Sequence, residues 1–264
     1  MSSILVPVDG SELSERIFSL MGRLPNPAAV KLFLLRVESD PKEEQLSAAI
    51  GYLGKLERRL RQTGFQVQYA LQEGDPAARI LATAALLQPS LLAISTHGKG
   101  GAAGRGSVAE EVLAACPVPL LVANPTALPL DPGLGFSRIL VPLDGSATAN
   151  RILPHVEGLA LQFGSEVVLL NVAAREDAAQ DLGPQRASLE KAGVRSVRAL
   201  TRVGEEAQAI LDVAREVNAD LLAFTSHTRG GESVRPFGSV AEILLRSSPV
   251  PLLVDRVPVP GTSP

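Results

Sequence analysis

The chain has few of the residues that disulfides and metal centres require. Its 264 residues include one cysteine, Cys116, and three histidines, His97, His155 and His227. One cysteine excludes an intramolecular disulfide, and its place at an expected helix end favours a small buried side chain over a reactive thiol. Since no other histidine or cysteine stands at the spacing of zinc ligands, we expect no metal site.

Long apolar runs and a basic surplus are also missing. No run approaches the roughly 20 apolar residues of a membrane-spanning helix. The net charge of −3 and pI near 5.7 give no reason to expect a nucleic-acid partner. The start, Met1 to Ile4, leads directly into a strand pattern, so we expect no signal peptide. With 45% apolar residues, the composition predicts a soluble cytoplasmic protein without a membrane partner.

Several motifs of catalysis and nucleotide binding are absent as well. The sequence contains neither the Walker A pattern nor a Gly-x-Ser-x-Gly nucleophile elbow. The dinucleotide fingerprint is matched loosely at 104–109, but not after the first strand, so we interpret this as a chance match. Asp9, His97 and Ser107 could suggest a hydrolytic triad, but Ser107 is better explained as a helix N-cap. We therefore predict no catalytic residue.

An internal repeat determines the expected organisation. Ile-Leu-Val-Pro-x-Asp-Gly-Ser stands at 4–11 and again at 139–146, and Pro-Val-Pro-Leu-Leu-Val stands at 117–122 and at 249–254. The recurrence of motifs in one order indicates a duplicated domain. We predict a first domain at 1–124, a linker rich in proline and glycine at 125–136, and a second domain at 137–264.

Within each copy, short apolar runs alternate with helical patterns. This alternation predicts an α/β fold with parallel strands and helices on both faces of the sheet. In the first copy we expect strands near 3–8, 29–37, 65–71, 90–95 and 119–123, and helices near 12–23, 42–63, 75–88 and 106–115. In the second copy we expect strands near 138–142, 166–173, 195–202, 220–225 and 251–255.

A glycine-rich loop follows the fourth strand of each copy. In the first copy it leads to Ser107-Val-Ala-Glu110, a capping box at a helix start, and Ser239 to Glu242 repeat this pattern. Glycines and a helix N-terminus can together hold phosphate. A capped helix after a flexible loop is the alternative, and the second copy favours a site.

Other polar residues are expected at the same edge of the sheet. Asp9 follows the first strand, Val37 closes the second and His97 follows the fourth, so a crevice where the strand order reverses would bring them together. Asp9 can cap the next helix, or accept a hydrogen bond from a ligand. The second copy repeats this set as Asp144, Val172 and His227.

These motifs resemble the universal stress protein family over nearly the whole chain, as two tandem domains. The resemblance rests on both repeated motifs above, the Leu-Leu-x-Val second strand, the Thr-His or Ser-His loop and the Gly-Ser-Val-Ala-Glu helix start. It implies in each half an open twisted five-stranded parallel sheet of order 3-2-1-4-5, of the adenine nucleotide alpha hydrolase-like type. Members that bind ATP carry Gly-x2-Gly-x9-Gly-Ser/Thr, with adenine near the Asp of the first strand and the Val of the second.

The resemblance therefore implies an ATP site in each half, with Mg2+ as a companion of the nucleotide. In the first half the binding residues would be Pro7, Val8, Asp9, Val37, Ser95, His97, Gly98, Gly106, Ser107, Val108 and Ala109. In the second half they would be Pro142, Leu143, Asp144, Val172, Thr225, His227, Thr228, Gly238, Ser239, Val240 and Ala241.

Both halves depart from that signature. Ser95 and Thr225 replace the first glycine, and Thr228 replaces the second glycine of the second half. Thr228 places a side chain where backbone should approach phosphate. Three hypotheses follow: a nucleotide-sensing module of the stress response, a scaffold of the same fold that binds no nucleotide, and a slow ATPase.

The last strand of each half, near 119–123 and 251–255, would lie at a sheet edge. An open apolar edge strand invites pairing, and the resemblance implies pairing of such strands about a two-fold axis. We predict antiparallel contact between them, which makes the chain an intramolecular pseudo-dimer with pseudo-two-fold symmetry that is able to form a further homodimer.

Overall fold

The chain folds into two compact units, one for each copy of the repeat. The computed structural model describes residues 2–22, 24, 26–96, 107–123, 136–226 and 238–257. The division between the units falls after Pro125. The linker bounds 125–136 and the pairing of the two edge strands stay predictions, and each unit is described by itself.

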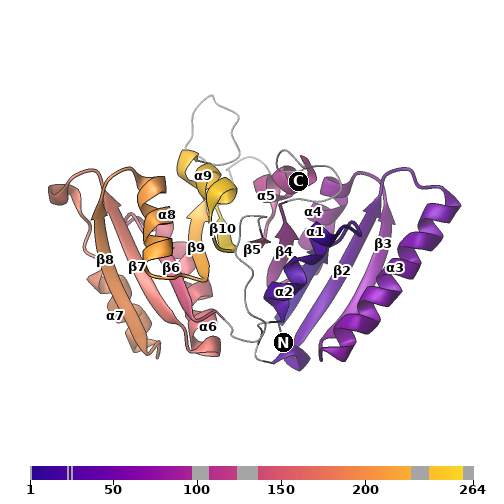
Figure 1. Ribbon diagram of the computed structural model, residues 1–264, viewed down its shortest axis with the longest axis horizontal. Coiled ribbons are helices and arrows are strands. Elements are labelled where there is room, and N and C mark those ends of the chain that lie inside the picture. The colour runs from indigo at the N-terminus through magenta and orange to yellow at the C-terminus, as the bar shows by residue number, and fades with distance from the viewer. Residues whose placement is uncertain are drawn as a thin grey trace. The chain divides into compact units, whose positions relative to one another are not determined.

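The first unit is an α/β domain with five parallel strands (Figure 1, indigo to magenta). Their order is β3-β2-β1-β4-β5, as the resemblance implies. Its strands are β1 (Ser2–Pro7), β2 (Val30–Glu38), β3 (Gln66–Glu73), β4 (Leu91–Ser95) and β5 (Leu120–Ala123). Its helices are α1 (Glu12–Glu15), α2 (Ile17–Met21), the 3-10 turn η1 (Pro27–Ala29), α3 (Glu43–Gln62), α4 (Pro76–Leu87) and α5 (Ser107–Ala115).

The second unit repeats this topology, with the order β10-β9-β6-β7-β8 (Figure 1, pink through orange to yellow). Its strands are β6 (Arg138–Pro142), β7 (Glu166–Ala173), β8 (Ser196–Val203), β9 (Leu221–Ser226) and β10 (Leu252–Arg256). Its helices are α6 (Leu153–Phe163), α7 (Gly183–Lys191), α8 (Glu206–Glu216) and α9 (Ser239–Ser247), with 3-10 turns η2 (Ala149–Ile152) and η3 (Glu176–Ala178).

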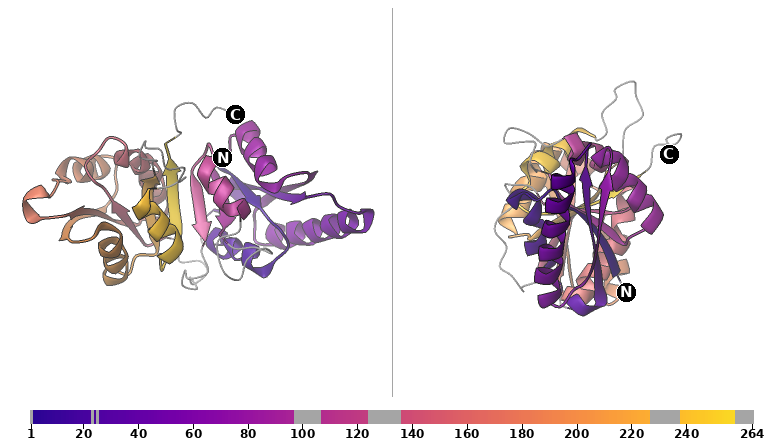
Figure 2. Two further views of the ribbon diagram at one scale, coloured as in Figure 1. Left: turned by 90° about the horizontal axis from the view of Figure 1, so that it is seen from above. Right: turned by 90° about the vertical axis from the view of Figure 1, so that its right-hand side faces the viewer.

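Each sheet lies between two layers of helices. Right-handed crossovers place the helices before β3 on one face and those after it on the other. In the first unit α3 accordingly packs against β2 and β3, while α4 packs against α5, and Figure 2 (right) shows helices on both sides of its strands. The central strands are buried on both faces, which explains their unbroken apolar runs.

Two expectations about helices are corrected by the structure. The helix expected at 12–23 is divided into α1 and α2, which meet at Arg16. In the second unit, Gly238 is the N-cap of α9 and makes no side-chain cap, so the capping box that the sequence suggests at Ser239 is wrong. Ser239 is instead the first residue of the helix.

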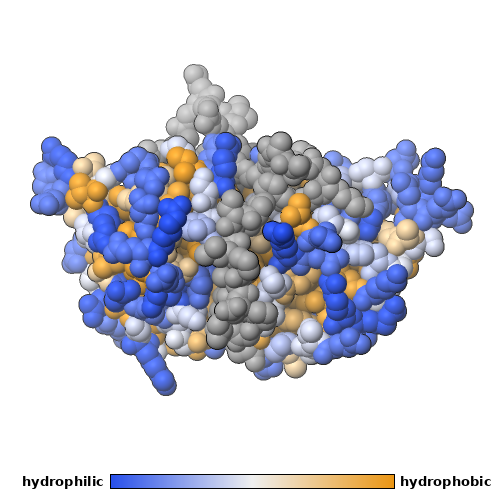
Figure 3. All heavy atoms as spheres, in the orientation of Figure 1, coloured by the Kyte–Doolittle hydropathy of each residue, from blue (hydrophilic) through white to orange (hydrophobic). Residues whose placement is uncertain are grey.

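Hydrophilic side chains cover most of the visible surface of each unit (Figure 3). The large apolar side chains that are exposed in the described residues are Ile50, Tyr69, Leu86, Leu87, Leu161, Val203 and Ile243. Most of them lie on different elements, and single exposed apolar residues of this kind are ordinary on a protein surface.

Candidate functional site

The second unit has a cleft of about 260 Å³ at the carboxyl ends of β6, β7 and β9. Helices α8 and α9 supply its remaining walls. The cleft brings together nine residues that the sequence analysis assigns to the second site: Pro142, Leu143, Asp144, Val172, Thr225, Gly238, Ser239, Val240 and Ala241. It is therefore the crevice expected where the strand order reverses.

Asp144 lies on a tight turn that the fold holds firmly. Its carboxylate accepts the backbone N–H of Ser146 at 2.9 Å, and Gly145 between them has φ +80°, which favours glycine. Behind the turn, the buried Asn171 amide donates to the Leu143 carbonyl at 2.9 Å. These contacts fix where the Asp144 carboxylate meets the cleft.

The end of β9 presents two hydroxyl groups with different surroundings. The Thr225 hydroxyl donates to the Ala149 carbonyl at 3.3 Å, on the side of η2. Ser226 is 3% exposed, and its hydroxyl has no hydrogen-bond partner among the described residues. Among the described residues, the fold therefore uses the Thr225 hydroxyl but not the Ser226 hydroxyl.

The first turn of α9 forms another wall, through Gly238, Ser239, Val240 and Ala241. Because the cap residue is glycine, no side chain of its own satisfies the first N–H groups of the helix. A nine-residue helix also places the positive end of its dipole there. This end of the cleft therefore suits an anionic group.

Sequence reasoning missed six lining residues: Ala149, Glu206, Ile210, Phe224, Ser226 and Leu244. Glu206 is the most consequential of these, since it adds a second carboxylate to the cleft that Asp144 lines. A signal for it exists in the repeat. Asp75-Pro76 opens α4 and Glu205-Glu206 opens α8, so Glu206 replaces a proline of the first copy.

In the first unit the predicted residues also gather at the carboxyl edge of the sheet. Pro7 ends β1 and Val8 follows it, Val37 lies near the end of β2, and Ser95 ends β4. The Asp9 carboxylate accepts two hydrogen bonds from Ser11, one from the backbone N–H at 2.8 Å and one from the side-chain hydroxyl at 2.7 Å. Val108 and Ala109 lie in the first turn of α5.

The remaining predicted positions cannot be compared with the structure. His97, Gly98, Gly106, His227 and Thr228 lie outside the described residues. Ser107 is the first residue of α5, and its side chain is not described.

A charged network lies against the Asp9 turn, with the Arg36 guanidinium next to Gly10. The Arg36 guanidinium lies 5.2 Å from the Tyr52 ring centre, and its Nε donates to Glu38 at 2.6 Å. The Tyr52 hydroxyl donates to Glu15 at 2.9 Å. Burial first, and then the Glu15 carboxylate, raise the pKa of Tyr52 above its usual range, while Arg36 opposes this shift. Tyr52 therefore stays neutral and acts as a donor.

The described residues contain neither a membrane-spanning helix nor a cluster of metal ligands. No helix in them is long and apolar enough to cross a membrane. No group of three or more His, Cys, Asp or Glu residues in the same part of the chain is arranged to hold a metal ion.

Comparisons with known proteins agree with this fold. A family model described as the universal stress protein family matches residues 1–124 and 173–256, whereas no curated protein gives a significant match. Among solved structures, a universal stress protein from Archaeoglobus fulgidus DSM 4304 is 24% identical, covers 96% of this chain and 98% of that chain, and has a TM-score of 0.82.

Further structures are similar at lower identity. A putative universal stress protein from Pseudomonas aeruginosa UCBPP-PA14 is 18% identical, covers 97% of this chain and 93% of that chain, and has a TM-score of 0.66. One from Arabidopsis thaliana with AMP bound is 17% identical over 47% of this chain and 92% of that chain, with a TM-score of 0.38. The full-length likenesses show the fold, and the family model covers well over half of the sequence. The chain therefore belongs to the universal stress protein family, with two of its domains in tandem.

Proposed function

We propose that this protein is a nucleotide-sensing module of the stress response, which binds an adenine nucleotide at the carboxyl end of each sheet. The observation that carries the proposal is the second-unit cleft, in which a carboxylate, apolar walls and a helix N-terminus converge. Each of these features suits a different part of one nucleotide.

The walls near β6 and β7 suit a planar base. Leu143, Val172 and Ile210 provide apolar surface, and the Asp144 carboxylate can accept a hydrogen bond from an exocyclic amine. The first turn of α9 offers backbone N–H groups and a positive dipole end to phosphate. A base at one end and a phosphate at the other is the arrangement that we infer for the nucleotide.

The proposed ligand is ATP, accompanied by Mg2+ through its phosphates. The described residues contain no group of side chains arranged to bind a metal ion, so any Mg2+ would be held largely by the nucleotide. We propose binding and regulation rather than turnover, because no described residue of the cleft is placed as a general base toward a nucleophile. The bound nucleotide would then act by favouring one conformation or partner surface.

A second candidate function is a scaffold that no longer binds nucleotide. Glu206 favours it, since this second carboxylate repels a polyphosphate from the same cleft. Thr225 favours it too, because this side chain replaces a signature glycine and its hydroxyl already contacts Ala149.

A direct experiment separates the candidates. The full-length protein is purified and denatured, and the released material is analysed by chromatography for adenine nucleotides. Calorimetry with ATP, ADP and AMP then gives affinity and stoichiometry. Co-purified nucleotide or saturable binding supports the sensing module. The absence of both supports the scaffold. A turnover assay on the same samples, with Asp9→Asn and His97→Ala variants, tests slow hydrolysis.

A further inference from the structure

The Ser226 hydroxyl stands out among the buried polar groups of the second unit. It ends β9, it lines the cleft, and its oxygen is buried without a partner among the described residues. Leaving a buried hydroxyl without a hydrogen bond is unfavourable, and each such group in a native fold needs a reason.

Ser226 lines the cleft together with the two residues before it in β9. Successive residues of a strand point to opposite faces, so Phe224 and Ser226 share one face and Thr225 points to the other. The Thr225 hydroxyl contacts the Ala149 carbonyl of η2 on its own face, so the Ser226 hydroxyl lies on the face opposite that contact. A serine side chain also turns readily among its staggered rotamers, so its hydroxyl can meet a ligand that enters.

The first unit provides a natural comparison. Thr96 occupies the equivalent position after β4, and it is fully buried. Its hydroxyl donates to the Ala123 carbonyl at 3.4 Å, and its backbone N–H donates to the same carbonyl at 2.9 Å. At this position the hydroxyl of the first unit bonds to β5, whereas the hydroxyl of the second unit has no bond to any part of the chain that the structure describes.

We propose that Ser226 is a ligand-contact residue of the second unit, whose hydroxyl bonds to an oxygen of the ribose-phosphate part of the bound nucleotide. The proposal rests on the proposed function. Ser226 ends β9, and it lines the same cleft as the first turn of α9. A ligand oxygen held there satisfies both the helix N–H groups and the hydroxyl. The second unit would thereby gain a contact that the first unit does not have.

The test compares Ser226→Ala with Thr96→Val in the full-length protein. Without ligand, Ser226→Ala should leave the melting temperature unchanged or raise it, because it removes an unpartnered buried hydroxyl. Thr96→Val should lower it, because it removes a bonded one. With AMP as the probe in calorimetry, Ser226→Ala should weaken the second-unit site roughly three- to tenfold, the range of one neutral hydrogen bond. Thr96→Val should leave that site unchanged.

Each other outcome has a definite meaning. If wild-type protein binds AMP and Ser226→Ala binds it equally well, the contact is refuted while the proposed function stands. If Ser226→Ala lowers the melting temperature as Thr96→Val does, the hydroxyl serves the fold and the inference is wrong. If wild-type protein binds neither AMP nor ATP, the proposed function itself fails. Adenosine separates the two oxygen sources: an equal loss for AMP and adenosine assigns a ribose oxygen, and a loss for AMP alone assigns phosphate.

Discussion

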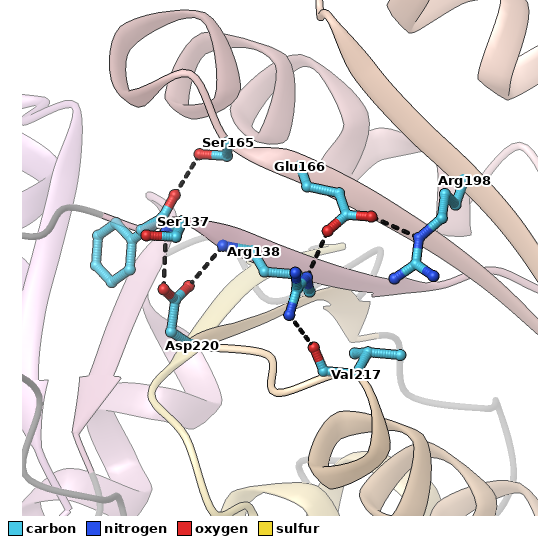
Figure 4. Close-up of polar contacts among 8 residues, drawn as sticks. Ser137, Arg138, Ser165, Glu166, Arg198, Val217 and Asp220 are labelled. Atoms are coloured by element: carbon cyan, nitrogen blue, oxygen red, sulfur yellow. Dashed lines mark hydrogen bonds and ion pairs between the residues drawn. The ribbon is translucent and has the colours of Figure 1, made fainter.

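Glu166 joins three neighbouring strands of the second unit, at the end of the sheet opposite the cleft (Figure 4). Its carboxylate accepts the Nε of Arg138 in β6 and the Nε of Arg198 in β8, both at 2.5 Å. Arg138 also donates to the Val217 carbonyl. One carboxylate thus holds two guanidinium groups, and we expect Glu166→Gln to destabilise this unit.

The size of the loss follows from exposure. The Glu166 side chain is 18% exposed, and those of its partners are 33% and 48% exposed. Exposed ion pairs contribute about 0.2–1 kcal/mol each, and hydrogen bonds to charged groups about 1.5–3 kcal/mol. Because solvent screens the two arginines, we expect the lower part of that range, about 1–2 kcal/mol in total. For a unit of this size, that loss corresponds to roughly 3–8 °C in melting temperature.

The pH dependence gives this prediction a sign. Burial alone would raise the pKa of Glu166, but the hydrogen bond from Arg138 and the charges of both arginines outweigh burial and hold it below its usual value. A depressed folded-state pKa contributes stability that is present above the unfolded value, about 4.3, and is lost as pH falls through the folded value. The difference in free energy of unfolding between wild type and Glu166→Gln should therefore be largest at neutral pH and should decrease below about pH 5.

Urea unfolding of wild type and Glu166→Gln across this pH range measures the difference in their free energies of unfolding. The matched control is Glu190→Gln, which breaks an exposed i,i+4 pair with Arg186 at 2.8 Å and should cost less than about 0.5 kcal/mol. The reasoning is refuted if Glu166→Gln loses no more stability than the control. It is also refuted if the difference in free energy of unfolding between wild type and Glu166→Gln stays constant as the pH falls.

Three further predictions concern the two sites. Gly10→Ala should destabilise the first unit by about 1–3 kcal/mol in urea unfolding, because φ is +79° and the new Cβ would lie 2.8 Å from the Arg36 guanidinium; an unchanged midpoint would contradict this. Ser239→Ala should change the melting temperature little, because this residue does not cap α9, yet weaken ATP binding several-fold in calorimetry; a stability loss with intact affinity would reverse the assignment. Gly98→Val should weaken ATP binding at the first site by crowding the phosphate path. We expect the first half to bind ATP at least as well as the second, because the second half has Thr228 in place of this glycine. Unchanged affinity and stoichiometry in Gly98→Val would contradict both expectations.

The sequence predicted the sheet well because its signals are local and repeated. Short apolar runs between turn residues identify buried parallel strands, and the recurrence of each run in one order confirms the assignment twice within one chain. Asp75 before Pro76 predicted the start of α4, and its carboxylate does accept the Ala78 N–H at 2.8 Å. Strand order could not come from such patterns, since it depends on contacts far apart in sequence, and the resemblance supplied it.

The candidate site was predicted only where a motif marks it. Nine residues of the second cleft belong to motifs that the repeat displays. Glu206 belongs to none, and Ser226 lies in the Ser-His motif but was not assigned to the site, because their role depends on which wall faces the cleft once α8 and β9 are packed. The capping box failed at α9 for a related reason: a Ser-x-x-Glu pattern does not say whether serine is the cap or the first helical residue, and a preceding glycine can take the cap position.

The two copies differ most in the side chains that surround this shared backbone. Behind the Asp-Gly-Ser turn, Arg36 stands in a charged network in the first unit, whereas Asn171 makes neutral amide hydrogen bonds at the same position in the second. After a duplication the two copies need not keep identical functions. The side chains around each turn can therefore change while the backbone of the turn is conserved between the copies. The Asp9 and Asp144 turns have nearly the same φ at their glycines, +79° and +80°. Because the geometry is kept and the electrostatic environment is not, we expect the two sites to bind the same class of ligand with different affinities.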